Sequence, residues 1–414
     1  GTHYWDLLRR EIFALINAKK SGSTVEKYKE ISLVENAKNF LIDILKIGLN
    51  YLSLRYIAKN KPLYLFTTFQ RHIKEGVIFD SVVDHLVDLV WDDSICIEHS
   101  NKNVINFYKI LKCDKTRIPP VYIYRSSVDA DIFEINEIIS KAIMKHFNLT
   151  LDVKNIALRN IQTFQSTENY YKKLFKFHSP RAIICSDDGS LKGIYSASKK
   201  ANIKTLEIQH GASIGSILWS YDESFNYSSI GLSIPNIFLT FSSLWSDAIN
   251  FPVEEKIAIG NDNLLQPIIN GQDGIVFISN KLVCDDLFKI ALDFEKINPI
   301  RIIYFKLHPQ EYFSKESITK RLPPDSNIVI LTNEMSNNNI FERCNHVVAV
   351  RSSLVYSALQ AGKSIYLYKK YNYDWDPYLL KLSLAFLNAN ELNTLINNII
   401  SSKEISSDRT QFFK

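Results

Sequence analysis

The stretch RAIICSDDGSLKGIYSASKKANIKTLEIQH, residues 181–210, decides the expected fold. It begins and ends with short runs of apolar and β-branched residues, and a segment of helical character separates them. Apolar runs that are buried on both faces and joined by helices are typical of parallel strands in α/β domains. The same alternation continues through residues 236–261 and restarts after the linker 262–274, so the sequence predicts doubly wound parallel sheets.

Two blocks of alternating strands and helices indicate two Rossmann-like domains that face a cleft. We expect an N-terminal domain over residues 1–250, a C-terminal domain over residues 255–385, and a C-terminal helix and tail over residues 386–414. Residues 4–20 and 34–58 have apolar side chains near helical spacing, so the first domain is expected to begin with extra amphipathic helices. Ligands bind such sheets at the carboxyl ends of the strands, which makes the residues there the candidates for function.

The composition excludes several classes of protein. The chain has 414 residues, of which 46% are hydrophobic and 22% are charged, so it is expected to fold around packed cores. It contains no apolar run long enough to span a bilayer and no signal-peptide pattern, so a cytoplasmic protein is expected. The net charge of +5 falls entirely within residues 1–62, which hold eleven basic and six acidic residues. A strongly basic face that binds nucleic acid is therefore not expected.

The common sequence signatures of several enzyme classes are absent. The chain has no G-x-G-x-x-G, G-x-x-x-x-G-K-[ST], H-E-x-x-H or G-x-S-x-G motif, which argues against the usual dehydrogenases, NTPases, metalloproteases and hydrolases. Two D-x-D patterns, at 129–131 and 374–376, have the form found in metal-dependent sugar transferases. We interpret the first as the cap of a helix and the second as part of an aromatic loop, so no metal site is predicted.

Two strands of the first domain end in polar residues. Asp187 and Asp188 follow the strand 181–186 directly, and repulsion between neighbouring carboxylates raises one pKa, which suits a general base. The structural alternative is an Asp cap on the following helix. His210 follows the strand 204–209 and precedes a glycine, so it can approach a substrate or instead bond to a loop carbonyl.

Two strands of the second domain end in groups that suit a nucleotide. Lys306, His308 and Pro309 follow one strand, where the proline fixes the turn and the lysine adds a positive charge near the imidazole. Glu334 comes after the next strand, at a position where a carboxylate often holds ribose hydroxyls. These residues are predicted to contact a nucleotide, and the alternative is a loop histidine beside a solvated lysine.

A third strand of the second domain, 346–350, is followed by Ser352 and Ser353, and a helix is expected to start at once. Two hydroxyls and the free N–H groups of a helix N-terminus form an anion site that needs no metal. A serine cap on the helix is the structural alternative, and both interpretations can hold together.

Taken together, the D-D-G sequence at 187–189, the H-P pair at 308–309 and the S-S pair at 352–353 resemble the three short motifs of bacterial sialyltransferases with the GT-B fold. The resemblance implies that a D-D-G carboxylate is the general base for the acceptor hydroxyl. It also implies that the H-P histidine and the paired serines contact the phosphate of CMP, and that Glu334 binds the ribose. The Q-H-G block at 209–211 looks more like the transferases of capsule and lipopolysaccharide synthesis, which use CMP-activated nonulosonic acids or Kdo.

These resemblances imply a metal-independent GT-B glycosyltransferase that moves a sialic-type or pseudaminic-type acid, or Kdo, from a CMP-activated donor to a bacterial surface glycan. No cofactor is expected, and the expected partners are the CMP-sugar and a glycan or glycolipid acceptor. In a retaining enzyme, Asp187 or Asp188 would act as a nucleophile instead of a base.

Four alternatives stay open: another nucleotide-sugar GT-B transferase, a CDP-glycerol phosphotransferase, a UDP-sugar 2-epimerase, and a non-catalytic GT-B subunit that binds a glycan or partner. Arg351 stands where the phosphotransferases usually carry a carboxylate, and R-S-S-L replaces the D-S-G-G of the epimerases. Both D-D-G carboxylates are present, which argues against the non-catalytic subunit.

The basic N-terminal end has two interpretations. The apolar faces of the expected helices 4–20 and 34–58 can pack on the first domain and leave the charges solvated. Alternatively, their basic and aromatic residues bind peripherally to an anionic inner-membrane surface, where a lipid-linked acceptor would lie.

Overall fold

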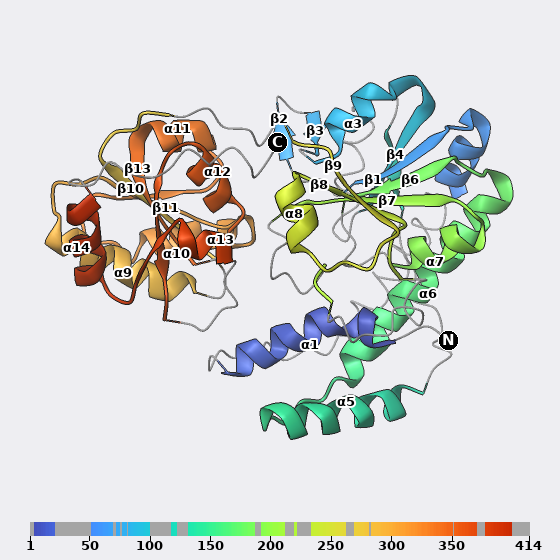
Figure 1. Cartoon of the computed structure of the whole chain (residues 1–414), viewed down its shortest axis with the longest axis horizontal. Coiled ribbons are helices and arrows are strands. Elements are labelled where there is room, and N and C mark those ends of the chain that lie inside the picture. The colour runs from blue at the N-terminus through green and yellow to red at the C-terminus, as the bar shows by residue number, and fades with distance from the viewer. Residues whose placement is uncertain are drawn as a thin grey trace. The chain divides into compact units, whose positions relative to one another are not determined.

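The computed structural model divides into two compact units (Figure 1). Unit 1 comprises Gly1–Thr240 and Ser246–Ala258, and unit 2 comprises Phe241–Trp245 and Ile259–Lys414. The structure describes residues 4–20, 51–68, 72–74, 77–80, 82–99, 117–121, 131–186, 192–211, 219–221, 233–261, 269–280, 283–350, 352–370 and 377–399.

Unit 1 is built on a seven-stranded sheet with the strand order β5-β4-β1-β6-β7-β8-β9, in which all neighbouring strands are parallel. Apolar side chains alternate between the two faces, because successive residues of a strand point to opposite sides. Ile183 packs against the helices α6 (Lys154–Phe177) and α7 (Gly193–Lys200), and Ile184 packs on the opposite face with Val83 and Val87, at the start of and within α3 (Asp84–Leu89). The strands are β1 (Tyr64–Thr68), β4 (Ser94–His99), β5 (Arg117–Val121), β6 (Ala182–Cys185), β7 (Lys204–Ile208), β8 (Ile237–Thr240) and β9 (Glu255–Ala258).

Helix α7 and the later part of α6 pack on this sheet, whereas α1 and α5 pack on the first part of α6, away from the strands (Figure 1). Residues 51–60 are also helical, within the range expected for the second amphipathic helix. The apolar pattern of the sequence also predicts a helix near residues 74–90. This prediction is wrong over its first part, where β2 (His72–Lys74) and β3 (Val77–Phe79) form an antiparallel pair. The helices with defined bounds are α1 (Tyr4–Lys20), α3 (Asp84–Leu89), α5 (Ile132–Phe147), α6 (Lys154–Phe177) and α7 (Gly193–Lys200). The residues of α8 (Ser243–Ala248) are divided between unit 2, up to Trp245, and unit 1, from Ser246 on.

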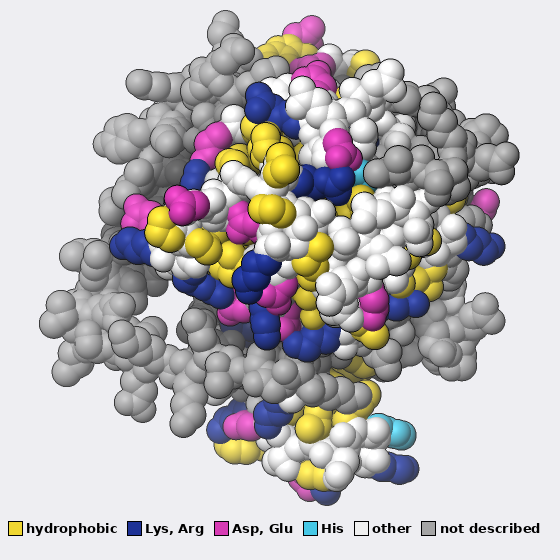
Figure 2. Space-filling model, turned by 90° about the vertical axis from the view of Figure 1, so that its left-hand side faces the viewer, with side chains coloured by type: hydrophobic (Ala, Val, Ile, Leu, Met, Phe, Trp, Pro, Cys, Tyr) yellow, Lys and Arg dark blue, Asp and Glu magenta, His cyan; other side chains and the backbone are white. Residues whose placement is uncertain are grey.

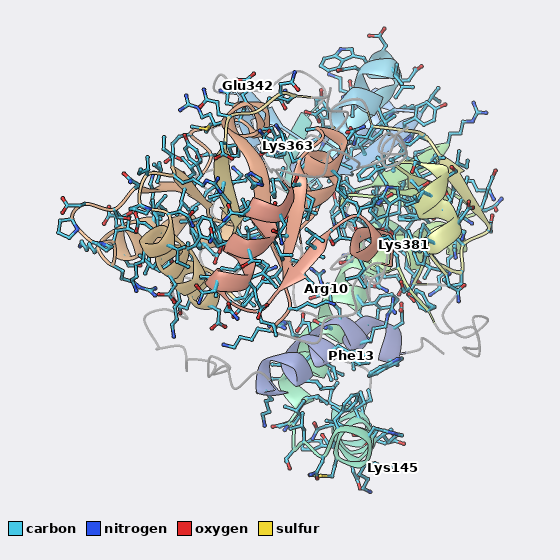
Figure 3. The ribbon with its side chains drawn as sticks, turned by 60° about the vertical axis from the view of Figure 1, so that its left-hand side comes forward. Arg10, Phe13, Lys145, Glu342, Lys363 and Lys381 are labelled. Carbon is cyan, nitrogen blue, oxygen red and sulfur yellow. The ribbon has the colours of Figure 1, made fainter. Side chains whose placement is uncertain are left out.

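Helix α1 is part of a packed helical layer. Its residues Leu8, Ile12 and Ile16 are buried in a cluster that also contains apolar residues of α5 and α6. Phe13 lies between α1 and α5, where its ring meets the ring of Phe147 edge to face at 6.3 Å (Figure 3). The first of the two interpretations of the basic N-terminal end therefore holds for α1, which packs on the first domain. The apolar face of α1 is buried there and is not available to a membrane.

Unit 2 is built on a six-stranded sheet with the order β12-β11-β10-β13-β14-β15, again with all neighbours parallel. The strands are β10 (Gly274–Ile278), β11 (Ile303–Lys306), β12 (Ile328–Leu331), β13 (Cys344–Ala349), β14 (Ser364–Tyr368) and β15 (Leu384–Phe386). The helices are α9 (Cys284–Ile297), α10 (Lys315–Thr319), α11 (Asn337–Arg343), α12 (Leu354–Gln360), α13 (Pro377–Lys381) and α14 (Ala389–Ile399), with the 3-10 helix η3 (Pro309–Ser314).

The core of unit 2 includes the last described helix. Leu392 and Ile396 of α14 are fully buried in the same cluster as Phe277 of β10 and Phe288 of α9. The last described helix is therefore part of the packed core of unit 2, directly after the edge strand β15.

Candidate functional site

The carboxyl ends of β10, β11, β12 and β13 lie at one edge of the unit 2 sheet, because these strands are parallel neighbours. The residues predicted to bind a nucleotide follow three of these strands. Neighbouring strands are about 4.8 Å apart, so the ends of β11 and β13, which flank β10, are about 10 Å apart. That span suits a nucleoside phosphate laid across the sheet edge.

Lys306 ends β11 and reaches toward the next strand. Its Nζ donates to the carbonyl oxygen of Thr332, just after β12, at 3.0 Å. Partial burial lowers the pKa of Lys306, and the negative charge of Glu334 opposes this shift. The lysine thus joins the ends of β11 and β12 and brings its positive charge to this edge.

The loop after β11 is held by a buried carboxylate that the sequence analysis missed. Glu311 is 4% exposed, and its Oε2 accepts the backbone N–H of His308 at 2.8 Å. Its Oε1 accepts the hydroxyl of Ser279, which follows β10, at 3.0 Å. In the other direction, the N–H of Glu311 donates to the carbonyl of His308 at 2.7 Å. The ends of β10 and β11 are therefore fixed to one another directly beneath His308.

The spacing of these residues could have revealed the role of Glu311. In a capping box, a carboxylate three residues after the cap accepts the cap's own backbone N–H, and proline is favoured at the first position of the helix. His308, Pro309 and Glu311 have this spacing, and the 3-10 helix η3 starts at Pro309. Pro309 therefore sets the start of η3, as its position in the H-P pair predicts.

Glu334 follows β12 and already has partners. It forms an ion pair with Lys315, and its Oε2 accepts the backbone N–H of Thr332 at 2.7 Å. The hydrogen bond from Lys315 is the main reason that the pKa of Glu334 falls to about 2. Its side chain is 48% exposed, so the carboxylate stays charged and accessible to a further donor.

Ser352 and Ser353 lie at the start of α12, as predicted. The Oγ of Ser352 accepts the backbone N–H of Leu354 at 3.2 Å, and the carbonyl of Ser353 accepts that of Tyr356 at 3.1 Å. The N-cap residue of α12 is Ser353, and its side chain makes no capping hydrogen bond, so the serine cap that the sequence left open as the alternative is not formed by Ser353; the hydroxyl of the preceding Ser352 binds the first N–H of the helix instead. α12 is a short helix of seven residues and Ser352 already uses one of its first N–H groups, so the strength of an anion site here depends on the hydroxyls more than on the helix.

In unit 1, the predicted base lies outside the described residues. Ser186 at the end of β6 is fully buried, and Asp187 and Asp188 come directly after it. His210 is described and lies two residues beyond β7, which is the neighbour of β6 in the sheet. The described residues therefore place His210 at the same sheet edge at which β6 ends.

His210 rests on a buried arrangement that the sequence analysis also missed. Its ring meets the indole of Trp219 edge to face at 4.9 Å. The indole N–H donates to Oε1 of Glu207 at 2.7 Å, and the hydroxyl of Tyr195 donates to Oε2 at 2.8 Å. Glu207 is fully buried in β7. Its position in an apolar strand gives no local signal, because its partners come from α7 and from the loop beyond His210.

A second buried carboxylate ties α1 to the loops of this edge. The side chain of Asp6 is fully buried, and its Oδ2 accepts from Lys192 Nζ at 2.6 Å and from Ser233 Oγ at 2.7 Å. Its Oδ1 accepts from the hydroxyl of Tyr221 at 2.6 Å and forms an ion pair with Nε of Arg9 at 3.1 Å. Lys192 follows the D-D-G segment, and Tyr221 and Ser233 flank part of the loop between β7 and β8. Asp6 thus joins the N-terminal helix to both candidate site loops of unit 1.

The D-x-D patterns supply no metal site that the structure describes. The side chain of Asp131 accepts the backbone N–H of Glu134 at 2.9 Å and caps α5, as predicted. The pattern at 374–376 lies outside the described residues. Within the described part of the chain, no group of three or more His, Cys, Asp or Glu side chains is arranged to hold a metal ion. None of the described helices combines the length and apolar character that a membrane span requires.

Comparisons with known proteins identify the fold. No protein-family model matches the sequence, and no curated protein is similar to it in sequence. A putative UDP-N-acetylglucosamine 2-epimerase from Listeria monocytogenes has a similar structure, with a TM-score of 0.51 and 10% identity over 85% of this chain and 92% of that one. The UDP-GlcNAc 2-epimerase of Methanocaldococcus jannaschii in complex with UDP-GlcNAc and UDP has a TM-score of 0.50 and 11% sequence identity, over 85% of this chain and 96% of that one. The glycotransferase of kitacinnamycin has a TM-score of 0.50 and 9% sequence identity, over 83% of this chain and 91% of that one.

These similarities extend over most of this chain and of each compared structure, and they are similarities of fold. Together with the two parallel sheets and their Rossmann-like order of strands and helices, they confirm the fold class that the sequence predicts: the chain has the GT-B fold.

Proposed function

We propose that the protein is a GT-B glycosyltransferase that moves a nonulosonic acid of the sialic or pseudaminic type, or Kdo, from a CMP-activated donor to a bacterial surface glycan. The observation that carries the proposal is the edge of the unit 2 sheet, where Lys306, His308 and Glu334 follow adjacent parallel strands. A cation, an imidazole and a charged carboxylate in this order match the phosphate and ribose of one nucleoside monophosphate.

In this proposal, unit 2 binds the donor. His308 and the hydroxyls of Ser352 and Ser353 hold the phosphate of CMP from the two sides of β10. Glu334 accepts the ribose hydroxyls, because an ionised carboxylate has about four lone-pair sites and its known partners leave some of them open. Pro309 and Glu311 keep the His308 loop in place during turnover.

Unit 1 supplies the base in this proposal, and no metal or other cofactor takes part. Asp187 or Asp188 accepts the proton of the acceptor hydroxyl as its oxygen forms a bond to the anomeric carbon. The bond from that carbon to the phosphate oxygen breaks, and CMP leaves with the electron pair. Lys306 and His308 stabilise the negative charge on the leaving phosphate. His210 is the reserve base, since it lies beyond the strand next to β6.

A UDP-sugar is the alternative donor, and one finding favours it. Two of the structures that are similar in fold are named as UDP-GlcNAc 2-epimerases, one of them in complex with UDP-GlcNAc and UDP. Against the epimerase reaction, this chain has R-S-S-L at 351–354 where the epimerases carry D-S-G-G.

A nucleotide panel tests the proposal. Thermal unfolding is measured with CMP, UDP and CDP, each at the same excess over protein, and then with CMP-linked and UDP-linked sugars. CMP is expected to raise Tm most, and His308→Ala is expected to remove that rise, whereas the exposed His146→Ala on α5 is expected to keep it. Stabilisation by UDP alone, or an equal response of His308→Ala and His146→Ala to CMP, would overturn the assignment.

A further inference from the structure

One side of unit 1 carries an unusual concentration of positive charge. The segments 51–63, 169–181 and 197–201 contain nine lysines and arginines and no aspartate or glutamate. By contrast, the face of the molecule in Figure 2 shows Lys and Arg interspersed with Asp and Glu. Seven of the nine basic residues are exposed: Arg55, Lys59, Lys61, Lys173, Lys176, Arg181 and Lys200.

The three segments form one continuous layer, although they are far apart in the sequence. Ile57 is buried in the same cluster as Leu174 of α6 and Ala197 of α7. The end of α6 is also tied to the segment after residue 60, because a ring nitrogen of His178 lies 2.7 Å from the carbonyl oxygen of Pro62. We call this layer, residues 51–63, 169–181 and 197–201, the basic aromatic face.

Large apolar side chains are exposed among the charges of this face. In the helical segment 51–60, Ile57 faces the core, while Tyr51, Leu52 and Tyr56 are 60%, 57% and 40% exposed. Positions 51, 52, 55 and 56 share one side of the helix, so Arg55 projects on the same side as these apolar residues. At the end of α6, Phe177 is 66% exposed.

A groove between α6 and α7 crosses the face. Its volume is about 510 Å³, and four lysines line it. Two of these lysines have an acidic partner, because the carboxylate of Glu168 forms ion pairs with Lys172 at 3.0 Å and with Lys200. One carboxylate therefore stands against several cations, and the positive charge of the groove is largely uncompensated by the described residues around it. The lysines that line the groove are Lys172, Lys173, Lys176 and Lys200.

We propose that the basic aromatic face docks on the surface of an anionic lipid bilayer. Basic side chains near such a surface attract the lipid headgroups, and Tyr, Phe and Leu side chains at the same level insert at the boundary with the acyl chains. The exposed Tyr51, Leu52, Tyr56 and Phe177 provide this apolar contribution. The inference stands apart from the proposed donor, because it concerns a surface of unit 1 and needs no nucleotide.

A nucleic acid is a less suitable occupant of this face. Bases stack on aromatic rings, but an exposed aliphatic side chain gains little from a phosphate backbone. Leu52 and Leu63 are 57% and 45% exposed, and both belong to the same segment as Arg55 and Lys59. Aliphatic residues between cations are better accommodated by the headgroup and acyl-chain boundary of a bilayer.

Vesicle co-sedimentation tests the proposal with the full chain and no nucleotide. The vesicles are made of phosphatidylcholine alone or with phosphatidylglycerol. We expect binding only with the anionic lipid and release at high salt, since salt screens surface charges. Lys173→Glu/Lys176→Glu is expected to lower the partition coefficient at least about 30-fold, the equivalent of about 2 kcal/mol for two basic residues. Leu52→Ser/Phe177→Ser tests the apolar contribution and is also expected to weaken binding.

The matched control is Lys145→Glu/Lys289→Glu, which changes the net charge equally on the exposed side of α5 and in unit 2 (Figure 3 labels Lys145). It is expected to bind vesicles like the wild type, and all variants should keep the wild-type Tm. The proposal is overturned if the wild type does not bind anionic vesicles or if the control loses binding as strongly as Lys173→Glu/Lys176→Glu. Salt-sensitive binding to single-stranded RNA without vesicle binding would also overturn it and assign the face to nucleic acid.

Discussion

Replacement of Asp6 by Asn tests whether the N-terminal helix is an integral part of unit 1. The Asp6 carboxylate is buried and accepts from Lys192, Tyr221 and Ser233, besides its ion pair with Arg9. Burial by itself raises the pKa of Asp6, but the charges of Lys192 and Arg9 outweigh it, so the pKa is lowered. A carboxyl with a lowered pKa contributes stability above its unfolded pKa of about 3.9, and that stability is lost as the pH falls through the folded value. At neutral pH its full contribution is therefore present.

The expected loss follows from the four contacts. An amide keeps one oxygen, which can serve two of the donors, and its NH2 group faces the other two. The substitution also removes the negative charge that compensates the charges of Lys192 and Arg9, whose side chains are themselves largely buried. Breaking a buried ion pair by removal of one partner costs about 3–5 kcal/mol. We expect Asp6→Asn to lower the free energy of unfolding of unit 1 by that amount.

Hydrogen exchange followed by mass spectrometry during urea titration measures this loss for unit 1 separately from unit 2. The matched control is Glu11→Gln on the same helix, because Glu11 pairs with Arg159 where both side chains are about one-third exposed. A pair that exposed contributes about 0–1 kcal/mol. If Asp6→Asn destabilises the peptides of α1 and α6 no more than Glu11→Gln does, the reasoning is refuted.

Four further outcomes are expected. Asp187→Ala or Asp188→Ala should lower kcat about 10²–10⁴-fold while CMP still raises Tm, and near wild-type rates in both variants would move the base to His210. Glu311→Leu leaves the N–H of His308 and the hydroxyl of Ser279 without their acceptor, at about 1–3 kcal/mol each. Since Glu311→Gln keeps one acceptor, kcat should be about 10-fold or more lower in Glu311→Leu than in Glu311→Gln, and equal rates would contradict this. Turnover should persist in EDTA, and its loss and recovery with Mg²⁺ or Mn²⁺ would refute the metal-free reaction. Burial is the main cause that lowers the pKa of His346, so the neutral side chain contributes stability above about pH 6.5, and this contribution is lost as the pH falls. Between about pH 7 and 5, the unfolding free energy of unit 2 should therefore fall less in His346→Gln than in the wild type. Urea titrations at the two pH values will measure this difference.

The strands that the sequence predicts are those in which local pattern and tertiary environment agree. β6 and β7 are short apolar runs followed or preceded by a helix, and both lie in the interior of the unit 1 sheet. For the strand next to β4, the sequence VYIYR predicts residues 121–125, whereas β5 is Arg117–Val121; the pattern misses its start because this segment contains two prolines. Proline is tolerated in this strand since β5 lies at the edge of the sheet, where one side of the backbone needs no ladder partner.

Helix α11 shows the opposite case. Asn337–Arg343 begins with three asparagines, which are poor helix formers, and the sequence gives no reason to expect a helix there. The side chain of Ser336 caps it by accepting the N–H of Asn339 at 3.2 Å, and Ile340 and Phe341 are fully buried. Packing of two side chains therefore overrides the weak local preference.

Some residues of the candidate site could likewise be predicted from the sequence, and others could not. The rule that function lies at the carboxyl ends of parallel strands locates Lys306, His308 and Glu334 from the sequence, because each follows a recognisable strand. It does not locate Glu207 or Asp6, because neither follows a strand and their partners are distant in the sequence. The hydrogen bond between Lys192 and Asp6 joins residues 186 positions apart, and Asp6 itself looks like an ordinary acidic residue in the first turn of a helix.

The charge of the N-terminal end has a different meaning in the structure than in the sequence. Counted along the chain, the excess of basic residues belongs to residues 1–62, and the sequence leaves open whether residues 4–20 pack on the first domain or bind a membrane. In the fold, Arg9 is used inside unit 1 against Asp6, while Arg55 and Lys59 join lysines of α6 and α7 on the basic aromatic face. The two roles are therefore separable: Asp6→Asn should destabilise unit 1 and leave the charges of that face intact, whereas Lys173→Glu/Lys176→Glu should weaken vesicle binding at least about 30-fold without loss of stability. A variant pair that failed to separate them would show that α1 and the face act as one surface.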